Sequence, residues 1–256
     1  DFGLRTLQQM QAGVNVLASA DGTVKGVRDG VVDRAYSAAN AEQVAGRECG
    51  NGVVIDHGDG WETQYCHMKK DSVAVRSGDK VQRGAVLGQV GISGRAQFAH
   101  VHLSVRHNGE TIDPFDPDGQ ITCGTPDTRT LWQSPPPYRA GGILDVGFSD
   151  SVPAYDDVKS GRAAKAALPA DAPALVVYGY AFGGQTGDKI HIDLTGPDGK
   201  VLDQTVTLDK AQAQFFRAIG KRLKGAAWTA GTYSGSVTLI RKGRQIDTRQ
   251  AEITLR

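Results

Sequence analysis

The sequence predicts an all-β protein of two domains in which most strands pair antiparallel. Short strand-like runs follow one another at close spacing, and turns rich in glycine separate them. The chain has 256 residues, which is comfortable for two compact domains. A stretch rich in proline and glycine interrupts the pattern at residues 124–142, and strand-like runs resume after it. We therefore expect two β domains joined by a linker.

The first predicted domain covers residues 1–123 and is a mostly antiparallel β-sheet. Its strand-like segments lie at residues 15–28, 52–68, 72–90 and 99–106. Turn dipeptides punctuate them, for example Asp21-Gly22 and Asn108-Gly109. Only residues 38–46 have a pattern that suggests a helix.

The second predicted domain covers residues 143–256 and follows the linker at 124–142. Its runs alternate around two hairpin turns, Thr195–Gly199 and Arg241–Arg244. Seven or so short strands in a segment of this length are typical of an immunoglobulin-like β-sandwich.

Charge and hydropathy argue against two classes of partner. The formal net charge is +1, and no long run of Lys or Arg occurs, so we expect no nucleic-acid binding. No apolar run reaches about 18 residues, so we expect no transmembrane segment.

The three cysteines, Cys49, Cys66 and Cys123, fit no Cys-x-x-Cys metal or redox spacing. Cys49 and Cys66 flank the predicted hairpin at 52–68, and antiparallel pairing would bring them together at its open end. A disulfide between them is one interpretation, and three buried thiols are the other. The disulfide favours an oxidising compartment, and it leaves Cys123 without a partner in the sequence.

The segment AHVHLSV at residues 99–105 carries the clearest chemical signal. In a strand, alternate side chains share a face, so His100 and His102 would project from the same side. Two imidazoles on one face can hold a metal ion or serve as acid and base. Two exposed histidines on a wet sheet edge are the simpler interpretation. A third histidine, His67 in TQYCHM, ends a predicted strand of the same domain and favours a site.

The motifs GNGVVIDHGDGWETQYCHM, SGDKVQRGAVLGQVGISG and AHVHLSV, taken in order, closely resemble the lysostaphin/LytM-type zinc metallopeptidases. The resemblance covers about residues 1–116. Members of that family cleave peptide cross-links of bacterial peptidoglycan, and the resemblance implies a LytM-like β-sheet peptidase domain.

Carried over position by position, the resemblance implies that His102 binds Zn²⁺ and that His100 acts on the attacking water. It implies that His67 helps to orient the water or to stabilise the tetrahedral intermediate. Asp1 would supply the carboxylate ligand, and the histidine of the family's His-x-x-x-Asp element would lie four residues before it. An exposed terminal acid is the other interpretation of Asp1.

We therefore expect a zinc-dependent endopeptidase that hydrolyses peptidoglycan cross-links, provided that the histidine before Asp1 is present. The expected location is exported, in the periplasm or at the cell surface of a bacterium. The alternative is a degenerate LytM-like domain that regulates or activates cell-wall amidases without catalysis. The expected partners are peptidoglycan stem peptides, and the C-terminal sandwich could bind a protein partner or a glycan.

Overall fold

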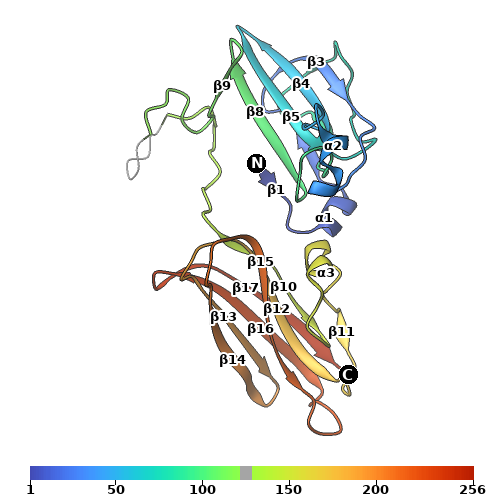
Figure 1. Ribbon diagram of the computed structural model, residues 1–256, viewed down its shortest axis with the longest axis vertical. Helices are drawn as coiled ribbons and strands as arrows, with labels where there is room; N and C mark the ends of the chain where they lie inside the picture. Colours follow the sequence, from blue (N-terminus) through green and yellow to red (C-terminus); the bar gives the residue numbers. More distant parts are fainter. Residues whose placement is uncertain (122–128) are drawn as a thin grey trace. The chain divides into compact units, whose positions relative to one another are not determined.

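The computed structural model describes residues 1–121 and 129–256 (Figure 1). The chain divides into two units, Asp1–Pro137 and Tyr138–Arg256. The boundary falls inside the linker expected at 124–142. Residues 124–128 of that linker, and Cys123, lie outside the described residues.

The first unit is built mainly from strands. Its elements are β1 (Phe2–Gly3), α1 (Leu7–Ala12), β2 (Asn15–Leu17), β3 (Gly22–Arg28), η1 (Ala38–Asn40), α2 (Ala41–Val44), β4 (Asn51–Gly58), β5 (Trp61–Met68), β6 (Lys80–Val81), β7 (Val86–Gln89), β8 (His100–His107) and β9 (Glu110–Ile112). The helical pattern expected at 38–46 corresponds to η1 and α2. Helix α1 was not expected, because six residues make fewer than two turns and cannot display a helical period.

The central sheet of this unit has the strand order β1-β8-β5-β4-β3-β6, with β9 paired to β8, and all its pairs are antiparallel (Figure 1). The hairpin expected at 52–68 is the β4–β5 pair, which turns between Gly58 and Trp61. Strands β2 and β7 form a separate antiparallel pair.

Alternation along the strands gives the central sheet two different faces. One face packs into a hydrophobic core that includes Val24, Val53, Ile55 and Tyr65. The residues between these core positions, such as Val54 on β4 and Gln64 on β5, belong to the opposite face. This opposite face is called the open face below, and it carries the residues of the site.

The second unit is a β-sandwich. Its elements are β10 (Gly142–Ser149), α3 (Tyr155–Ser160), β11 (Ala167–Leu168), β12 (Ala174–Gly184), β13 (Lys189–Gly196), β14 (Gly199–Thr207), β15 (Gln212–Arg222), β16 (Gly231–Arg241) and β17 (Arg244–Leu255). One sheet has the order β10-β12-β15 and the other β11-β17-β16-β13-β14. One apolar core contains residues of both sheets, for example Val177, Ile219, Ile192 and Leu239. The all-β fold class is thus confirmed, and both expected hairpins are present.

Short helix α3 was not expected in the sandwich. Tyr155 on this helix stacks on Phe216, with ring centroids 5.5 Å apart, and Val158 is fully buried. The helix is held by these tertiary contacts, and its six residues are again too few to show a period in the sequence.

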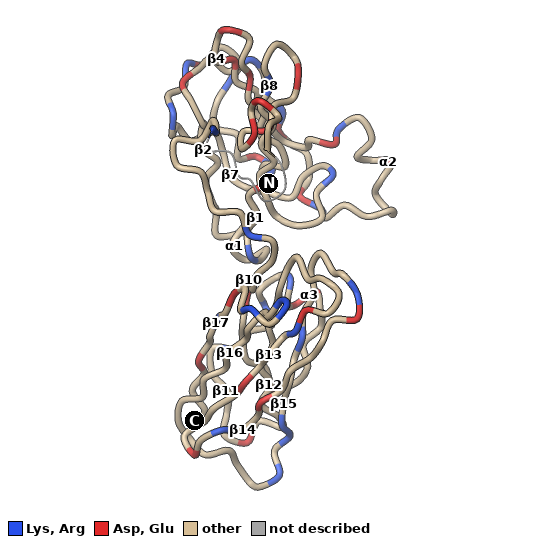
Figure 2. The backbone as a smooth tube through the Cα atoms, turned by 90° about the vertical axis from the view of Figure 1, so that its left-hand side faces the viewer, with Lys and Arg blue, Asp and Glu red and all other residues tan. Residues whose placement is uncertain are grey.

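Charged residues of both signs are interspersed along the backbone of each unit (Figure 2). Within the described residues, no helix has the length and apolar character needed to cross a membrane.

Candidate active site

Strand β8 brings both of its paired histidines to one carboxylate. The Nδ1 atom of His102 lies 2.7 Å from Oδ1 of Asp1, and Nε2 of His100 lies 3.8 Å from the same oxygen. His102 is partly exposed, with a side chain 45% accessible, whereas His100 is only 5% exposed. His102 is thus accessible from solvent, whereas His100 is buried beside it.

The register of β1 against β8 places Asp1. Phe2 pairs with Val101 and Gly3 with His100 in an antiparallel ladder, so Asp1 comes to lie beside His102. The two residues are 101 positions apart in the sequence. The carboxylate is half-exposed, and the ring nitrogen of His102 is its nearest charged or polar partner.

A β-bulge turns His67 toward the same site. Asn51 pairs with Met68 and Val53 with Tyr65, so Cys66 and His67 together lie opposite Gly52. His67 has a φ of 62°, in the left-handed region that non-glycine residues rarely adopt. Strict alternation would place His67 on the same face as Tyr65, in the core. The bulge instead brings its ring to within 4.7 Å of the His100 ring and 6.0 Å of the His102 ring, between centroids.

Backbone carbonyls fix the tautomers of the two buried histidines. Nδ1 of His67 lies 2.8 Å from the carbonyl oxygen of Ser93, and Nδ1 of His100 lies 2.9 Å from that of Phe98. A carbonyl oxygen can only accept a hydrogen bond, so Nδ1 carries the proton in both rings. In both neutral rings Nε2 is therefore left as a base.

Burial keeps these imidazoles neutral. Loss of hydration lowers the pKa of His67 to about 4, and the neighbouring His100 and His102 lower it further, against the opposing effect of the Ser93 hydrogen bond. Burial is also the main cause that lowers the pKa of His100 and of His102. At neutral pH all three rings are uncharged, which is the form that binds a metal or accepts a proton.

The donor atoms that converge here have the right chemistry for zinc, but they are few. A carboxylate oxygen and an imidazole nitrogen are both zinc donors, and Nδ1 of His102 faces Asp1. When Nδ1 binds a metal, Nε2 must carry the proton, and Oγ of Ser104 lies 3.1 Å away as its acceptor. A catalytic zinc needs three protein ligands, and no His, Cys, Asp or Glu cluster of three within the described chain is arranged to hold one.

A disulfide joins Cys49 to Cys66, the first residue of the bulge. Cys66 precedes His67 and pairs with His102 across the strands. The carbonyl oxygen of Cys49 accepts the backbone N–H of His67 at 2.7 Å. The cross-link therefore ties the segment before β4 to the strand end that carries His67.

Sequence reasoning named the four side chains of the site and missed the groups that support them. Ser93 holds His67 through its carbonyl, while its hydroxyl donates to the carbonyl of Met68 and accepts the backbone N–H of Asn51. Gly50, with a φ of 66°, packs so closely on Ser93 that a Cβ atom would lie 2.5 Å from it. The sequence signal that could have pointed to this support is Asn51, a polar residue directly before the run Gly52–Ile55. The structure buries it fully, and a buried amide needs hydrogen-bond partners.

A search against protein families matches residues 9–114 to peptidase family M23. Among curated relatives, the cell division protein DipM of Caulobacter vibrioides is 30% identical over 119 residues, which are 45% of this chain and 18% of that protein. The DD-carboxypeptidase/endopeptidase Mpg of Neisseria meningitidis is 36% identical over 104 residues, 40% of this chain and 19% of Mpg. The peptidoglycan DD-endopeptidase ShyA of Vibrio cholerae is 33% identical over 77 residues, 30% of this chain and 17% of ShyA.

This chain aligns with less than a fifth of the length of each of these three relatives. The family match lies within the β-sheet unit that carries the histidine site, which agrees with the resemblance to LytM-type peptidases. Residues 9–114 thus match the model of peptidase family M23, and this part of the chain is similar to its peptidases.

Proposed function

We propose that the first unit is a zinc-dependent endopeptidase that hydrolyses peptide cross-links of bacterial peptidoglycan. The observation that carries the proposal is the convergence of one carboxylate and three neutral imidazoles on the open face of the sheet. The match of residues 9–114 to peptidase family M23 and the alignment with a peptidoglycan DD-endopeptidase support the same function.

Asp1 and His102 are the residues that would hold the metal. The third ligand in this proposal is the histidine that the family pattern has four residues before Asp1. Zinc bound there would act as a Lewis acid on water and on the peptide carbonyl. Ser104 would keep the ring of His102 in the ligating tautomer by accepting its Nε2 proton.

His100 and His67 are proposed to move protons and to stabilise charge. Nε2 of His100 lies close to the carboxylate of Asp1 and is unprotonated, so it can take a proton from the attacking water and return it to the leaving amine. His67 has the same tautomer, and its ring faces both other histidines. It can orient the water, or it can stabilise the tetrahedral intermediate once protonated.

An exported location, in the periplasm or at the cell surface, is part of the proposal because the substrate lies there. The Cys49–Cys66 disulfide supports it, since disulfides persist in oxidising compartments. A role of the sandwich in binding a protein partner or a glycan is also proposed, as a function separate from the peptidase site.

The test uses the full chain extended N-terminally to include the position four residues before Asp1. We expect about one zinc ion per chain and release of cross-link fragments from purified peptidoglycan. His100→Ala should abolish that release without lowering the zinc content. An extended, zinc-loaded protein that leaves peptidoglycan intact would contradict the proposal.

One observation favours the second candidate, a non-catalytic LytM-like regulator of cell-wall amidases. At this site Asp1 and His102 are the donor groups in direct contact, and no group of three His, Cys, Asp or Glu side chains in the described part of the chain is arranged to hold a metal ion. An extended chain that binds no zinc but raises the activity of a purified amidase would establish this function instead.

A further inference from the structure

A row of residues leads across the open face from the histidine site to Arg28. His102 on β8 pairs with Cys66 on β5, and the Cys66–His67 bulge lies opposite Gly52 on β4. Gly52 in turn pairs with Arg28 on β3. The row crosses three strand spacings of about 4.8 Å, so the Cα atoms of His102 and Arg28 are about 14 Å apart.

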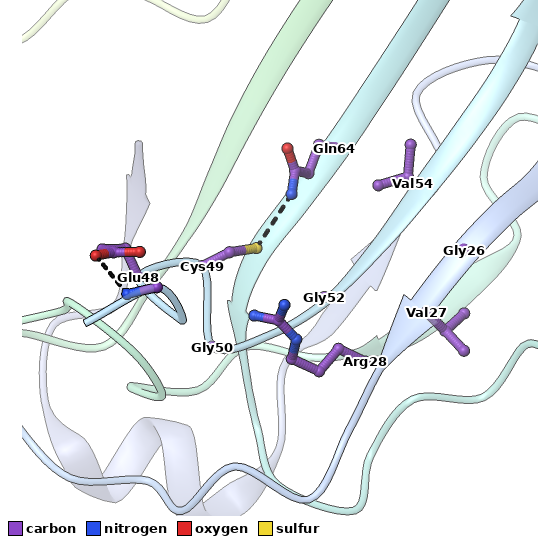
Figure 3. Close-up of a pocket in the computed structure, with 10 residues that line it drawn as sticks. Gly26, Val27, Arg28, Glu48, Cys49, Gly50, Gly52, Val54 and Gln64 are labelled. Carbon is purple, nitrogen blue, oxygen red and sulfur yellow. Dashed lines mark hydrogen bonds between the residues drawn. The ribbon is translucent and has the colours of Figure 1, made fainter. Parts of the chain in front are cut away.

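A pocket of about 370 Å³ occupies the Arg28 end of this row (Figure 3). Its lining comes from β3, β4 and β5 and from the segment before β4. The residues that line it are Gly26, Val27, Arg28, Gly46, Glu48, Cys49, Gly50, Gly52, Val54 and Gln64. A Cβ atom at Gly26 or Gly46 would meet nothing within 4 Å, so a ligand can approach the backbone there, whereas Ser93 covers Gly50 and Sγ of Cys49 covers Gly52.

The two charged groups of the pocket differ in how they are satisfied. The carboxylate of Glu48 accepts the backbone N–H of Gly46 at 2.9 Å, and backbone hydrogen bonds are the main cause that lowers its pKa. The guanidinium of Arg28 makes no hydrogen bond or ion pair with any described residue, although its charge contributes to the lowered pKa of Glu48. In Figure 3 its side chain extends beside Gly50 and Gly52 toward Cys49. The pocket therefore holds a guanidinium whose donors are available to a ligand.

We propose that Arg28 is a specificity-determining residue that binds a carboxylate of the peptide substrate. The inference rests on the proposed peptidase function, because the site at His100 and His102 fixes where the scissile bond lies. An extended peptide advances about 3.3 Å per residue, so it crosses the row in about four residues. The carboxylate bound by Arg28 is therefore within about four residues of the cleaved bond.

The chemistry of the Arg28 guanidinium favours this occupant. A guanidinium binds a carboxylate through two parallel hydrogen bonds, which a neutral side chain cannot match. Gln64 on β5, two residues before Cys66, also lines the pocket, and its side-chain amide contacts Sγ of Cys49 at 3.4 Å (Figure 3). An extended peptide that runs from the histidine site to Arg28 would pass over the Cys49–Cys66 disulfide, because Cys66 and Gly52 are buried and Sγ of Cys49 covers Gly52.

The experiment compares two synthetic cross-linked peptides of identical length. One has free carboxylates within four residues of the scissile bond, and the other has carboxamides at the same positions. Dissociation constants are measured by calorimetry, and kcat/KM by chromatography, for the N-terminally extended chain and for Arg28→Gln, Arg28→Lys and Arg76→Gln. Arg76 is an exposed arginine outside the row and serves as the matched control.

We expect the parent chain and Arg76→Gln to bind the carboxylate peptide about tenfold more tightly than the carboxamide peptide. Arg28→Gln should reduce that ratio to near one, and Arg28→Lys should keep a smaller preference because it keeps the charge and loses the paired geometry. A preference that is equal in the parent chain and in Arg28→Gln would overturn this inference and leave the proposed function standing. If neither peptide is bound or cleaved, the proposed function fails, and the inference fails with it.

Discussion

Each unit of the chain contains a histidine in contact with an aspartate at nearly the same distance. In the first unit, Nδ1 of His102 lies 2.7 Å from Asp1, and in the second, Nε2 of His191 lies 2.8 Å from Asp203. Asp203 also pairs with Lys200, and no further histidine belongs to the second unit. His102 instead lies beside two buried rings, those of His67 and His100.

A contact between a histidine and a carboxylate is therefore not sufficient to make an active site. The pair at His191 is exposed and is completed by an ammonium group, so it is an ordinary surface ion pair. At His102 the neighbouring imidazoles are dehydrated and neutral, and each keeps an unprotonated Nε2. The two regions differ in the buried neutral imidazoles beside His102, and not in the histidine–aspartate contact that they share.

The units also differ in which polar groups they bury. The second unit buries a charged pair, in which the guanidinium of Arg241 contacts the carboxylate of Asp188 at 2.7 Å and donates to the carbonyl of Gly183 at 2.7 Å. The first unit buries imidazoles that meet only carbonyl groups through Nδ1. The second unit thus buries a charged pair that is satisfied by its own partners, whereas the first unit buries imidazoles that remain neutral.

The largest effect that would test this comparison is on catalysis. We expect His100→Ala to lower kcat for peptidoglycan cross-link cleavage by about 10²–10⁴-fold, because general acid–base groups contribute by that factor. His191→Ala, the matched change in the second unit, should leave kcat unchanged. Equal losses in the two variants would show that the buried imidazole has no special role.

Arg241→Met should produce the largest loss of stability. It leaves the carboxylate of Asp188, which is 2% exposed, buried without its guanidinium. Removal of one partner from a buried ion pair costs about 3–5 kcal/mol of unfolding free energy. Hydrogen exchange read by mass spectrometry should show the loss in peptides of residues 138–256 only. Arg222→Met, at an exposed position, is the control, and a comparable loss there would contradict the assignment.

Acid should produce a smaller effect in the second unit. Burial by itself raises the pKa of Asp188, but hydrogen bonds from Arg241 and from the backbone N–H of Gln185 outweigh it, and the net pKa lies below the usual 3.8. A depressed folded-state pKa stabilises the fold above the unfolded-state value and loses that contribution as the pH falls through the folded value. Unfolding free energy of the parent chain should therefore fall below about pH 4. In Asp188→Asn this part of the pH dependence should be absent, and an unchanged acid profile would refute the assignment.

The smallest effect concerns the strained backbone at His67. Both His67→Ala and His67→Gly remove the imidazole, but only glycine adopts a φ of 62° without strain. We expect the glycine variant to be more stable than the alanine variant by about 1 kcal/mol in denaturant unfolding. At His191, on a regular strand, the order should reverse. If the alanine variant were the more stable one at His67, the backbone there would not be strained for a non-glycine residue.

Much of this architecture could be read from local patterns. The hairpins at Thr195–Gly199 and Arg241–Arg244 depend on turn residues and on the runs beside them, and these are properties of short segments. The shared face of His100 and His102 follows from strand alternation alone. The disulfide between Cys49 and Cys66, one of two interpretations of the cysteines, follows from their places at the open end of one hairpin.

The sequence by itself determined which side chains are candidates for the proposed chemistry, because residue type and strand period are local. Only the tertiary structure decided that His67 leaves the core face, since a bulge depends on how β5 pairs with β4. The β1–β8 register brings Asp1 to His102, and the carbonyl of Ser93 fixes the proton of His67. Arg28 likewise joins the row only through its pairing with Gly52. Pairing register and backbone carbonyl positions depend on residues distant in sequence, so no local pattern specifies them.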